Sequence, residues 1–383
     1  MITEFSFPTR IVFGEGALKE VPNNLARLGV KKPLIVTDPG IVAAGLLGRL
    51  TAVLDAERVP HAVFDAVEPN PTGVTVENGL SAWRETGCDG IIGLGGGSPI
   101  DAAKGVRLLA THPLPLAQYD DARDGWRLVT NPLPPMIAIP TTSGTGSEVG
   151  RSFVVVLRET GRKTVVFAPL LMPSVAVCDP ELTYDLPPRL TAATGMDAFT
   201  HNLEALCAKG FHPLADAMAR QGLVYCARFL VRAVKDGRDA EARAGMMIAA
   251  ITGAAAFQKG LGAAHALAHA LTPVAGVHHG MANAIVLPFV MEFNLIAAGP
   301  QLAEAVRALG AAPDDEDRLA RRAVELVRAL AREVGIPERL SEVGVKESML
   351  PLLTERAFED ACHQANQRPC RPADLEALLR AAL

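Results

Sequence analysis

Four residues in the second half of the chain have the types and the spacing of a metal site: Asp197, His201, His265 and His279. Asp197 and His201 stand four residues apart in a stretch with helical periodicity, so their side chains leave the same face of a helix and can hold one ion. The stretch from His265 to His279 is otherwise nearly all Ala, Leu, Gly, Pro and Val. Imidazoles and a carboxylate in such an apolar environment predict a buried metal centre, because an ion offsets the cost of desolvating them.

An ordinary alternative exists for each histidine, since a buried helix histidine can be satisfied by a backbone carbonyl or a neighbour. However, four of the nine histidines lie between His265 and His279, and His265 and His269 repeat the i, i+4 spacing. The proline and glycine of TPVAG are then expected to turn the chain before His279. Spacing and environment agree for the set, which favours the metal centre. The pattern does not resemble HExxH, so a zinc protease is disfavoured.

A glycine-rich turn in the first half comprises Gly95, Gly96, Gly97 and Ser98, after the buried run IIGL and before a helical stretch. Glycines let a backbone come close to a bulky group, and free amides at a helix N-terminus point at an anion, so the turn predicts a phosphate or pyrophosphate site. Ser98 and Asp101 resemble a capping pair. The alternative is a tight turn that binds nothing. The turn is neither GxGxxG nor a P-loop, so a conventional Rossmann fingerprint is absent.

Three further stretches add candidate nucleotide contacts. The loop PTTSGTGSE (140–148) is dense in hydroxyls and can wrap phosphate or ribose, although such clusters are usually simple loops. Asp38 ends the apolar run PLIVT, where a carboxylate can accept hydrogen bonds from an adenosine ribose and repel a 2′-phosphate. Asp38 could equally be a turn residue, and Asn70 in EPNPTG has the same ambiguity between turn and ligand contact.

The elements that must position these residues divide the chain in two. Up to about Leu182, short apolar runs alternate with helical stretches, as in a parallel sheet with crossover helices. The predicted strands cover residues 33–37, 61–64, 90–94, 136–140, 153–157 and 175–178. Beyond Pro187 the sequence becomes Ala/Leu-rich and helical. We therefore expect an α/β, Rossmann-like nucleotide-binding domain over residues 1–186 and an all-α metal-binding, catalytic domain over residues 187–383, divided where consecutive prolines break any helix.

Composition limits the function further. A chain of 383 residues suggests two domains, and a net charge of −5 without a basic face argues against nucleic acid or an anionic membrane as partner. The six cysteines form no CxxC pair, which fits a reduced, cytoplasmic setting. The N-terminus lacks a signal-peptide pattern. The longest apolar run, from Ala244 to Phe257, is too short to span a bilayer and predicts a buried helix.

In this order the motifs resemble those of the iron-containing (group III) alcohol dehydrogenase family, over essentially the whole chain. The matching motifs are GGGSPIDAAK (95–104), PTTSGTGSE (140–148), ATGMDAFTH (193–201) and the H-x3-H-x9-H run that starts at 265. The resemblance implies a dehydroquinate synthase-like architecture. In that architecture a nucleotide-binding domain precedes a helical domain, and a cleft between them holds NAD(P) against a divalent metal.

By motif position, the resemblance also implies roles for individual residues. The implied metal ligands are Asp197, His201, His265 and His279, with His278 a neighbour. His269 matches the family's extra active-site histidine, near metal and nicotinamide. The implied cofactor-binding positions are Asp38, linked to a preference for NAD over NADP, Gly95, Gly96, Gly97 and Ser98 at the pyrophosphate, and Thr141, Thr142, Thr145 and Lys163 around the nucleotide. A homodimer or larger homo-oligomer is implied as well.

The implied reaction interconverts an alcohol with an aldehyde or ketone by hydride transfer to and from NAD, and His269 is expected to relay a proton. Four protein ligands would close a tetrahedral zinc site, whereas iron(II) accepts five or six, so Fe2+ is expected and Zn2+ is a possible substitute. Small aliphatic alcohols, diols and hydroxyacids all remain open as substrates. One alternative is a NAD-using, metal-dependent lyase or cyclase of the dehydroquinate synthase type. Another is a metal-dependent hydrolase in which the glycine turn holds a substrate phosphate.

Overall fold

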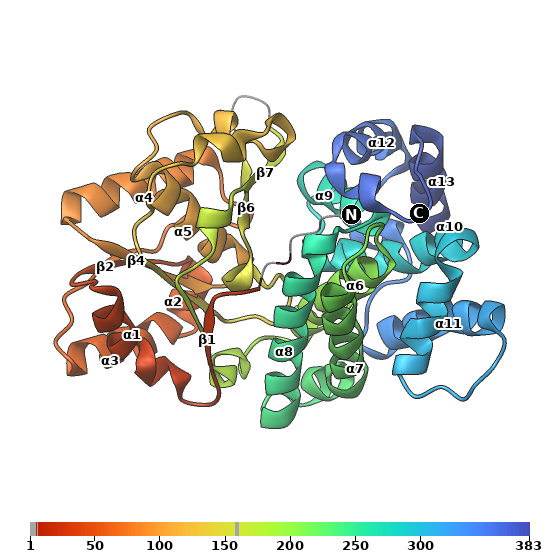
Figure 1. Ribbon diagram of the computed structural model, residues 1–383, viewed down its shortest axis with the longest axis horizontal. Helices are drawn as coiled ribbons and strands as arrows, with labels where there is room; N and C mark the ends of the chain where they lie inside the picture. Colours follow the sequence, from red (N-terminus) through yellow and green to blue (C-terminus); the bar gives the residue numbers. More distant parts are fainter. Residues whose placement is uncertain (1–4, 6, 158–160) are drawn as a thin grey trace. The chain divides into compact units, whose positions relative to one another are not determined.

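The computed structural model describes Phe5, residues 7–157 and residues 161–383. The described residues form two compact units (Figure 1). The first comprises Phe7–Thr142 and Gly146–Asp185, and the second comprises Leu186–Leu383 together with Phe5 and Ser143–Thr145. The loop PTTSGTGSE is therefore divided, because three of its residues belong to the second unit.

The first unit is built on a six-stranded parallel sheet with the strand order β1-β8-β5-β4-β2-β3. The strands are β1 (Arg10–Phe13), β2 (Pro33–Val36), β3 (Ala62–Phe64), β4 (Gly90–Gly95), β5 (Met136–Pro140) and β8 (Val175–Cys178). The helices of the unit are α1 (Val21–Leu28), α2 (Pro39–Ala43), α3 (Leu46–Ala56), α4 (Gly73–Thr86) and α5 (Gly97–Leu109). This arrangement confirms the predicted α/β fold class.

Helices cover both faces of this sheet. Leu34 and Val36 of β2 pack into a core that includes residues of α4 and α5, whereas Ile35 packs into a second core with residues of α1 and α3. Successive side chains of a strand point to opposite faces, so a strand between two helical layers is apolar at every position. The continuous run PLIV of β2 is accordingly buried throughout.

Two parts of the strand prediction are corrected. The segment predicted over 153–157 forms β6 (Ser152–Val156), which pairs antiparallel with β7 (Lys163–Phe167) in a separate two-stranded sheet. β1 and β7 are absent from the predicted strands. Both contain three consecutive apolar residues, in RIVF and KTVVF, so the sequence offered a signal for each strand that the prediction did not use.

In the second unit, every regular element within the described residues is a helix, which confirms the predicted all-α fold class of this half. These helices are α6 (Pro188–Cys207), α7 (Pro213–Lys235), α8 (Ala240–Ala256), α9 (Ala263–Ala275), α10 (His279–Ala308), α11 (Glu316–Glu333), α12 (Leu350–Glu359) and α13 (Pro372–Ala382), besides short 3-10 turns. α6 packs against α7, α8 and α10. It is buried at every position from Thr191 to Cys207, and a Cβ added to Gly195 would lie 2.3 Å from Leu230 Cδ1. Small residues in α6 therefore permit close approach of its neighbours.

The turn before His279 differs from the prediction. Pro273 lies inside α9 and does not end it, whereas Gly276, with φ 69°, forms the C-cap. A left-handed cap suits glycine because glycine has no Cβ, and proline cannot adopt that conformation. The residue that turns the chain is therefore the glycine of TPVAG alone.

One helix among the described residues, α10, is long and apolar enough to cross a membrane by length and composition. In the fold, 67% of its apolar window is buried. It packs against α6, α9 and α11, so it serves as a core helix of this unit. The apolar run from Ala244 to Phe257 lies mostly in α8, which is also a buried helix as predicted.

Candidate active site

Helix α6 carries the first two residues of the candidate metal site. Asp197 and His201 are one turn apart on it, and their exposed fractions are 2% and 5%. The uninterrupted helix from Pro188 to Cys207 explains why the i, i+4 spacing places both side chains on one face. A carboxylate and an imidazole buried in an apolar bundle need polar partners, which come from other helices.

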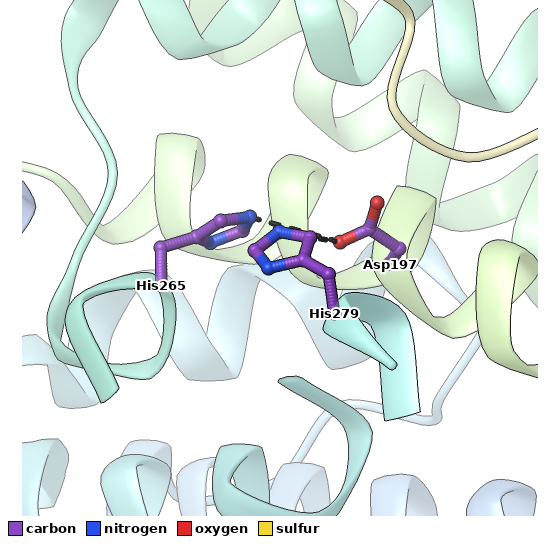
Figure 2. Close-up of side chains that lie close together, drawn as sticks. All are labelled: Asp197, His265 and His279. Atoms are coloured by element: carbon purple, nitrogen blue, oxygen red, sulfur yellow. Dashed lines mark ion pairs between the residues drawn. The ribbon is translucent and has the colours of Figure 1, made fainter. Parts of the chain in front are cut away.

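Those partners are His265 near the start of α9 and His279 at the first position of α10. Donor atoms of Asp197, His265 and His279 all lie within 4.8 Å of one another. Asp197 Oδ1 is 3.8 Å from His265 Nε2 and 3.5 Å from His279 Nε2 (Figure 2). Three helices thus bring together three side chains that are spread over 82 positions of the sequence, from Asp197 to His279.

His201 lies beside this three-residue group and is not part of it. Its ring stacks on the ring of His265 with a centroid separation of 4.5 Å. Burial lowers the pKa of His201 to about 4, which outweighs the opposing effect of the Asp197 carboxylate, so the imidazole is neutral at physiological pH. Its Nδ1 is buried and has no hydrogen-bond partner among the described residues. A neutral, buried imidazole has the chemistry of a metal ligand, and the assignment of His201 as the fourth ligand remains a prediction.

Glu204 is a buried residue of the site that the sequence analysis missed. Its Oε2 lies 2.6 Å from His265 Nδ1. Burial would lower the pKa of His265, but the hydrogen bond to Glu204 and the negative charges of Glu204, Asp197 and Asp360 together raise it. Glu204 stands three residues after His201 on α6, and that i, i+3 spacing was a signal the sequence offered.

Asn283, one turn after His279 on α10, is a second residue that the sequence analysis missed. Its Nδ2 lies 2.8 Å from Asp197 Oδ1 and 3.2 Å from both His265 Nε2 and His279 Nε2. An amide group has two hydrogens, so it cannot donate fully to three acceptors. Three acceptor atoms that converge on one point suit a divalent cation, and the residues present therefore fit a metal.

His269 lies next to the group and has a carboxylate of its own. Its ring stacks on His279 with centroids 5.1 Å apart, and its Nδ1 is 2.8 Å from Asp360 Oδ2. Burial would raise the pKa of Asp360, but His269 and the hydrogen bonds from Cys362 together lower it, so Asp360 is ionised. Donor atoms of His269, Asp360 and Cys362 form a second group within 4.8 Å. Sequence reasoning had no signal for Asp360, which is 91 residues from His269.

Most of the residues predicted to bind a nucleotide lie in the first unit near the carboxyl ends of three neighbouring strands, β2, β4 and β5. Asp38 follows β2, Gly95 ends β4, and Thr141 follows β5. The strand order reverses between β2 and β4, because β3 lies on one side of β2 and β4 on the other. Ligands of open α/β sheets bind at such a reversal.

Several contacts join these strand ends. The Thr37 hydroxyl donates to the Leu94 carbonyl at 2.8 Å, and the Thr141 amide donates to the Gly95 carbonyl at 3.0 Å. The Asn70 amide donates to Ser98 Oγ at 3.3 Å.

Gly96 and Thr142 are neighbours at the same edge. A Cβ added to Gly96 would lie 3.4 Å from the Thr142 side chain. One edge of the sheet therefore carries most of the predicted nucleotide-binding residues. These are Asp38, Asn70, Gly95, Gly96, Gly97, Ser98, Thr141 and Thr142.

The predicted capping pair is wrong. α5 begins at Gly97, its N-cap is Gly96, and no side chain caps it. The Asp101 carboxylate instead accepts from Ser147 Oγ at 2.5 Å and from the Val154 amide at 2.9 Å. Buried Lys104 donates to the same Ser147 Oγ at 3.0 Å. The first amides of α5 are thus not capped by a side chain, as an anion site at a helix N-terminus requires.

The two remaining cofactor candidates lie elsewhere. Lys163 is the first residue of β7, and its positive charge acts on Asp101. Thr145 belongs to the second unit, whereas Thr141 and Thr142 belong to the first. The hydroxyl-rich loop PTTSGTGSE therefore does not lie within one unit.

Comparison with known proteins gives matches to both halves of the chain. The family described as "Iron-containing alcohol dehydrogenase" matches residues 8–180, and "Fe-containing alcohol dehydrogenase family, C-terminal" matches residues 191–383. A 4-hydroxybutyrate dehydrogenase from Cupriavidus necator is 40% identical over 98% of each chain. A 1,3-propanediol dehydrogenase from Klebsiella pneumoniae is 38% identical over 99% of this chain and 98% of its own. The crystal structure of a 1,3-propanediol oxidoreductase matches at 38% identity with a TM-score of 0.96, over 100% of both chains.

Proposed function

This chain belongs to the iron-containing alcohol dehydrogenase family, and from that premise we propose that it is an Fe2+-dependent, NAD-linked dehydrogenase of a short primary alcohol. In the oxidative direction, the alcohol carbon gives a hydride to NAD+ and the hydroxyl gives up a proton, so the products are an aldehyde and NADH. The observation that carries the proposal is the convergence of Asp197, His265 and His279 on one buried point.

Asp197, His201, His265 and His279 would hold the metal. A bound divalent iron would supply Lewis acidity, which lowers the pKa of an alcohol hydroxyl and polarises an aldehyde carbonyl. Three neutral imidazoles and one carboxylate leave a bound divalent cation with a net charge of about +1, which favours an anionic oxygen nearby. Zinc can take the same donor set, and iron is preferred here because it accepts the extra ligand that a substrate provides.

The edge formed by the ends of β2, β4 and β5 would hold the dinucleotide. The uncapped first turn of α5 faces the pyrophosphate in this proposal, and the Asp38 carboxylate accepts from the adenosine ribose. A carboxylate at that place repels the extra phosphate of NADP, so NAD is the expected cofactor. Lys163 and Thr145 are proposed to complete the nucleotide contacts.

His269 is proposed to carry the proton between substrate oxygen and solvent. The ionised Asp360 at its Nδ1 keeps a proton on that nitrogen, which leaves Nε2 as the atom that exchanges protons. An imidazole held in one orientation by a carboxylate is suited to this step, because the ring does not have to turn before each transfer.

A primary alcohol with a second oxygen function at its far end is the substrate class we propose. Two of the similar proteins are named for 4-hydroxybutyrate and for 1,3-propanediol, which are both short chains of this type. The six cysteines, all within the described residues, are free thiols, which supports a reduced, cytoplasmic setting. A homo-oligomer is proposed from the family alone.

The test is NADH formation by anaerobically purified, Fe(II)-loaded protein with 1,3-propanediol, 4-hydroxybutyrate, 1-propanol and ethanol. Zn(II)-loaded protein serves as the parallel sample. We expect NADH formation to depend on iron and to be fastest with the diol or the hydroxyacid. If the protein binds NAD and consumes a substrate with no net NADH, the lyase alternative gains support and the dehydrogenase is wrong.

A further inference from the structure

We infer that Glu204 is a positioning residue of the metal centre, which fixes the ring of His265 so that Nε2 presents its lone pair to the ion. The inference rests on the proposed function, because it takes His265 as a metal ligand. Glu204 contributes no donor atom to the three-residue group of Asp197, His265 and His279. Its effect on the metal would pass through His265, by way of the ring and of the backbone that carries it.

The first observation is the hydrogen bond between the two side chains. Glu204 Oε2 lies 2.6 Å from His265 Nδ1, and the exposed fractions of the two residues are 6% and 1%. An ionised carboxylate only accepts, so the proton of the imidazole must be on Nδ1. Nε2 then carries a lone pair, and it is the atom that lies 3.8 Å from Asp197 Oδ1. Metal-bound histidines commonly have such a carboxylate at the other ring nitrogen.

The second observation concerns the start of α9, the helix that carries His265. Its N-cap is Gly262, which has no side chain to cap the helix. Glu204 serves instead, because its carboxylate accepts from the amides of Gly262 at 3.0 Å and Ala264 at 2.8 Å. A Cβ on residue 262 would lie 2.6 Å from Glu204 Oε1, so glycine at this position makes room for the carboxylate. The carboxylate therefore fixes both the backbone and the ring of the histidine.

Replacing the carboxylate with a carboxamide separates the inference from a general loss of packing. Glu204→Gln keeps the size of the side chain but offers one acceptor oxygen and one NH2 group. If that NH2 group faces His265, the imidazole must move its proton to Nε2 to avoid two opposed donors. A protonated Nε2 cannot bind a metal. If the amide turns the other way, its NH2 group opposes the amide of Ala264, and α9 loses part of its cap.

The test is a double-mutant cycle on the full chain, with the affinity for cobalt(II) measured by competition with a chromophoric chelator. We expect Glu204→Gln to weaken cobalt binding by about 10- to 100-fold. In a His265→Ala background, we expect the same substitution to change affinity by less than about twofold, because the ring through which Glu204 acts is gone. The visible spectrum of bound cobalt should also change in Glu204→Gln, since the ligand set differs.

Two further variants keep the test decisive. Glu304→Gln removes a carboxylate of the same unit that pairs with Arg220 at the surface, and it should bind cobalt as the unaltered protein does. Glu204→Asp replaces Glu204→Gln in the test if the latter does not fold. It keeps the charge at the helix start, but its carboxylate is one methylene shorter and holds His265 less well. Cobalt affinity should therefore fall, but by less than is expected for Glu204→Gln.

The outcomes separate the inference from the proposed function. An equal loss for Glu204→Gln in both backgrounds, or no loss in either, would overturn the positioning role. If His265→Ala itself leaves cobalt affinity unchanged, the proposed metal site is wrong, and the role of Glu204 is overturned with it.

Discussion

His269 Nδ1 and Asp360 Oδ2 lie 2.8 Å apart, although the two residues are 91 positions apart in the sequence. One comes from α9, and the other follows the end of α12. The side chains of both are about 15% exposed, so the pair is shielded but can still reach solvent. This pairing gives the proposed proton carrier a fixed orientation.

We expect His269→Ala to lower kcat by about 100-fold while the metal content stays unchanged, because general acid–base groups contribute at this level. Asp360→Asn should give a smaller loss, since the imidazole remains but is no longer held by a charge. The measurements are steady-state turnover and metal analysis on the same preparations. Glu359→Gln is the matched control, because it removes the neighbouring carboxylate, which pairs with Arg356. Loss of metal from His269→Ala would instead make His269 a ligand.

Metal binding should depend on His201 even though His201 lies outside the three-residue group. A metal that binds only the folded chain stabilises it by about 4 kcal/mol at a thousandfold excess over Kd. We expect a chelator to lower the Tm of the unaltered protein, and His201→Ala to abolish most of that difference. Thermal unfolding with and without chelator makes the comparison. An unchanged metal-dependent Tm in His201→Ala would reduce the site to three protein ligands.

The cofactor preference should change when the charge of Asp38 is removed. Asp38 also caps α2, because its Oδ1 accepts from the Ile41 amide at 2.9 Å. Asp38→Asn keeps an acceptor for this cap but loses the negative charge, so kcat/KM with NADP should rise about tenfold without loss of stability. Asp38→Ala should show a similar gain with NADP and a stability loss of about 1 kcal/mol. An unchanged NADP/NAD ratio in both variants would place the ribose elsewhere.

Stability should fall between about pH 5 and pH 7 because of Glu148. Burial raises the pKa of Glu148 to about 7, and its exposed fraction is 2%. Its ordinary pKa is 4.5, so in this window the folded chain binds more protons than the unfolded chain. The contribution of Glu148 to stability is therefore complete below pH 4.5 and is lost as pH rises through 7.

We expect Glu148→Gln to remove this part of the pH dependence, which amounts to at most about 3 kcal/mol at 1.4 kcal/mol per pKa unit. Denaturant unfolding at pH 5, 6, 7 and 8 gives the unfolding free energy of Glu148→Gln and of the unaltered chain as a function of pH. The difference in unfolding free energy between Glu148→Gln and the unaltered chain should grow in favour of the variant as pH rises. A constant difference over this range would show that Glu148 does not titrate there.

Much of the candidate site could be predicted from local sequence. Asp197 and His201 share a helix face because helical periodicity fixes it, and an apolar sequence around several histidines indicates burial. The glycine turn after IIGL was expected at the carboxyl end of a strand. A parallel sheet places the carboxyl ends of all its strands on one edge. These inferences need only spacing and burial.

The tertiary structure decided the rest. Glu204 and Asp360 contact His265 and His269 across 61 and 91 residues, and no periodicity links positions so far apart. Asp101 looked like a capping partner because it stands three residues after Ser98, but its carboxylate instead accepts from the Ser147 hydroxyl and the Val154 amide, which are distant in the sequence. Local spacing thus determined which side chains leave one face of one helix. Only the packing of α6, α9 and α10 determined which of them meet, because long-range contacts follow from how the helices fill a core.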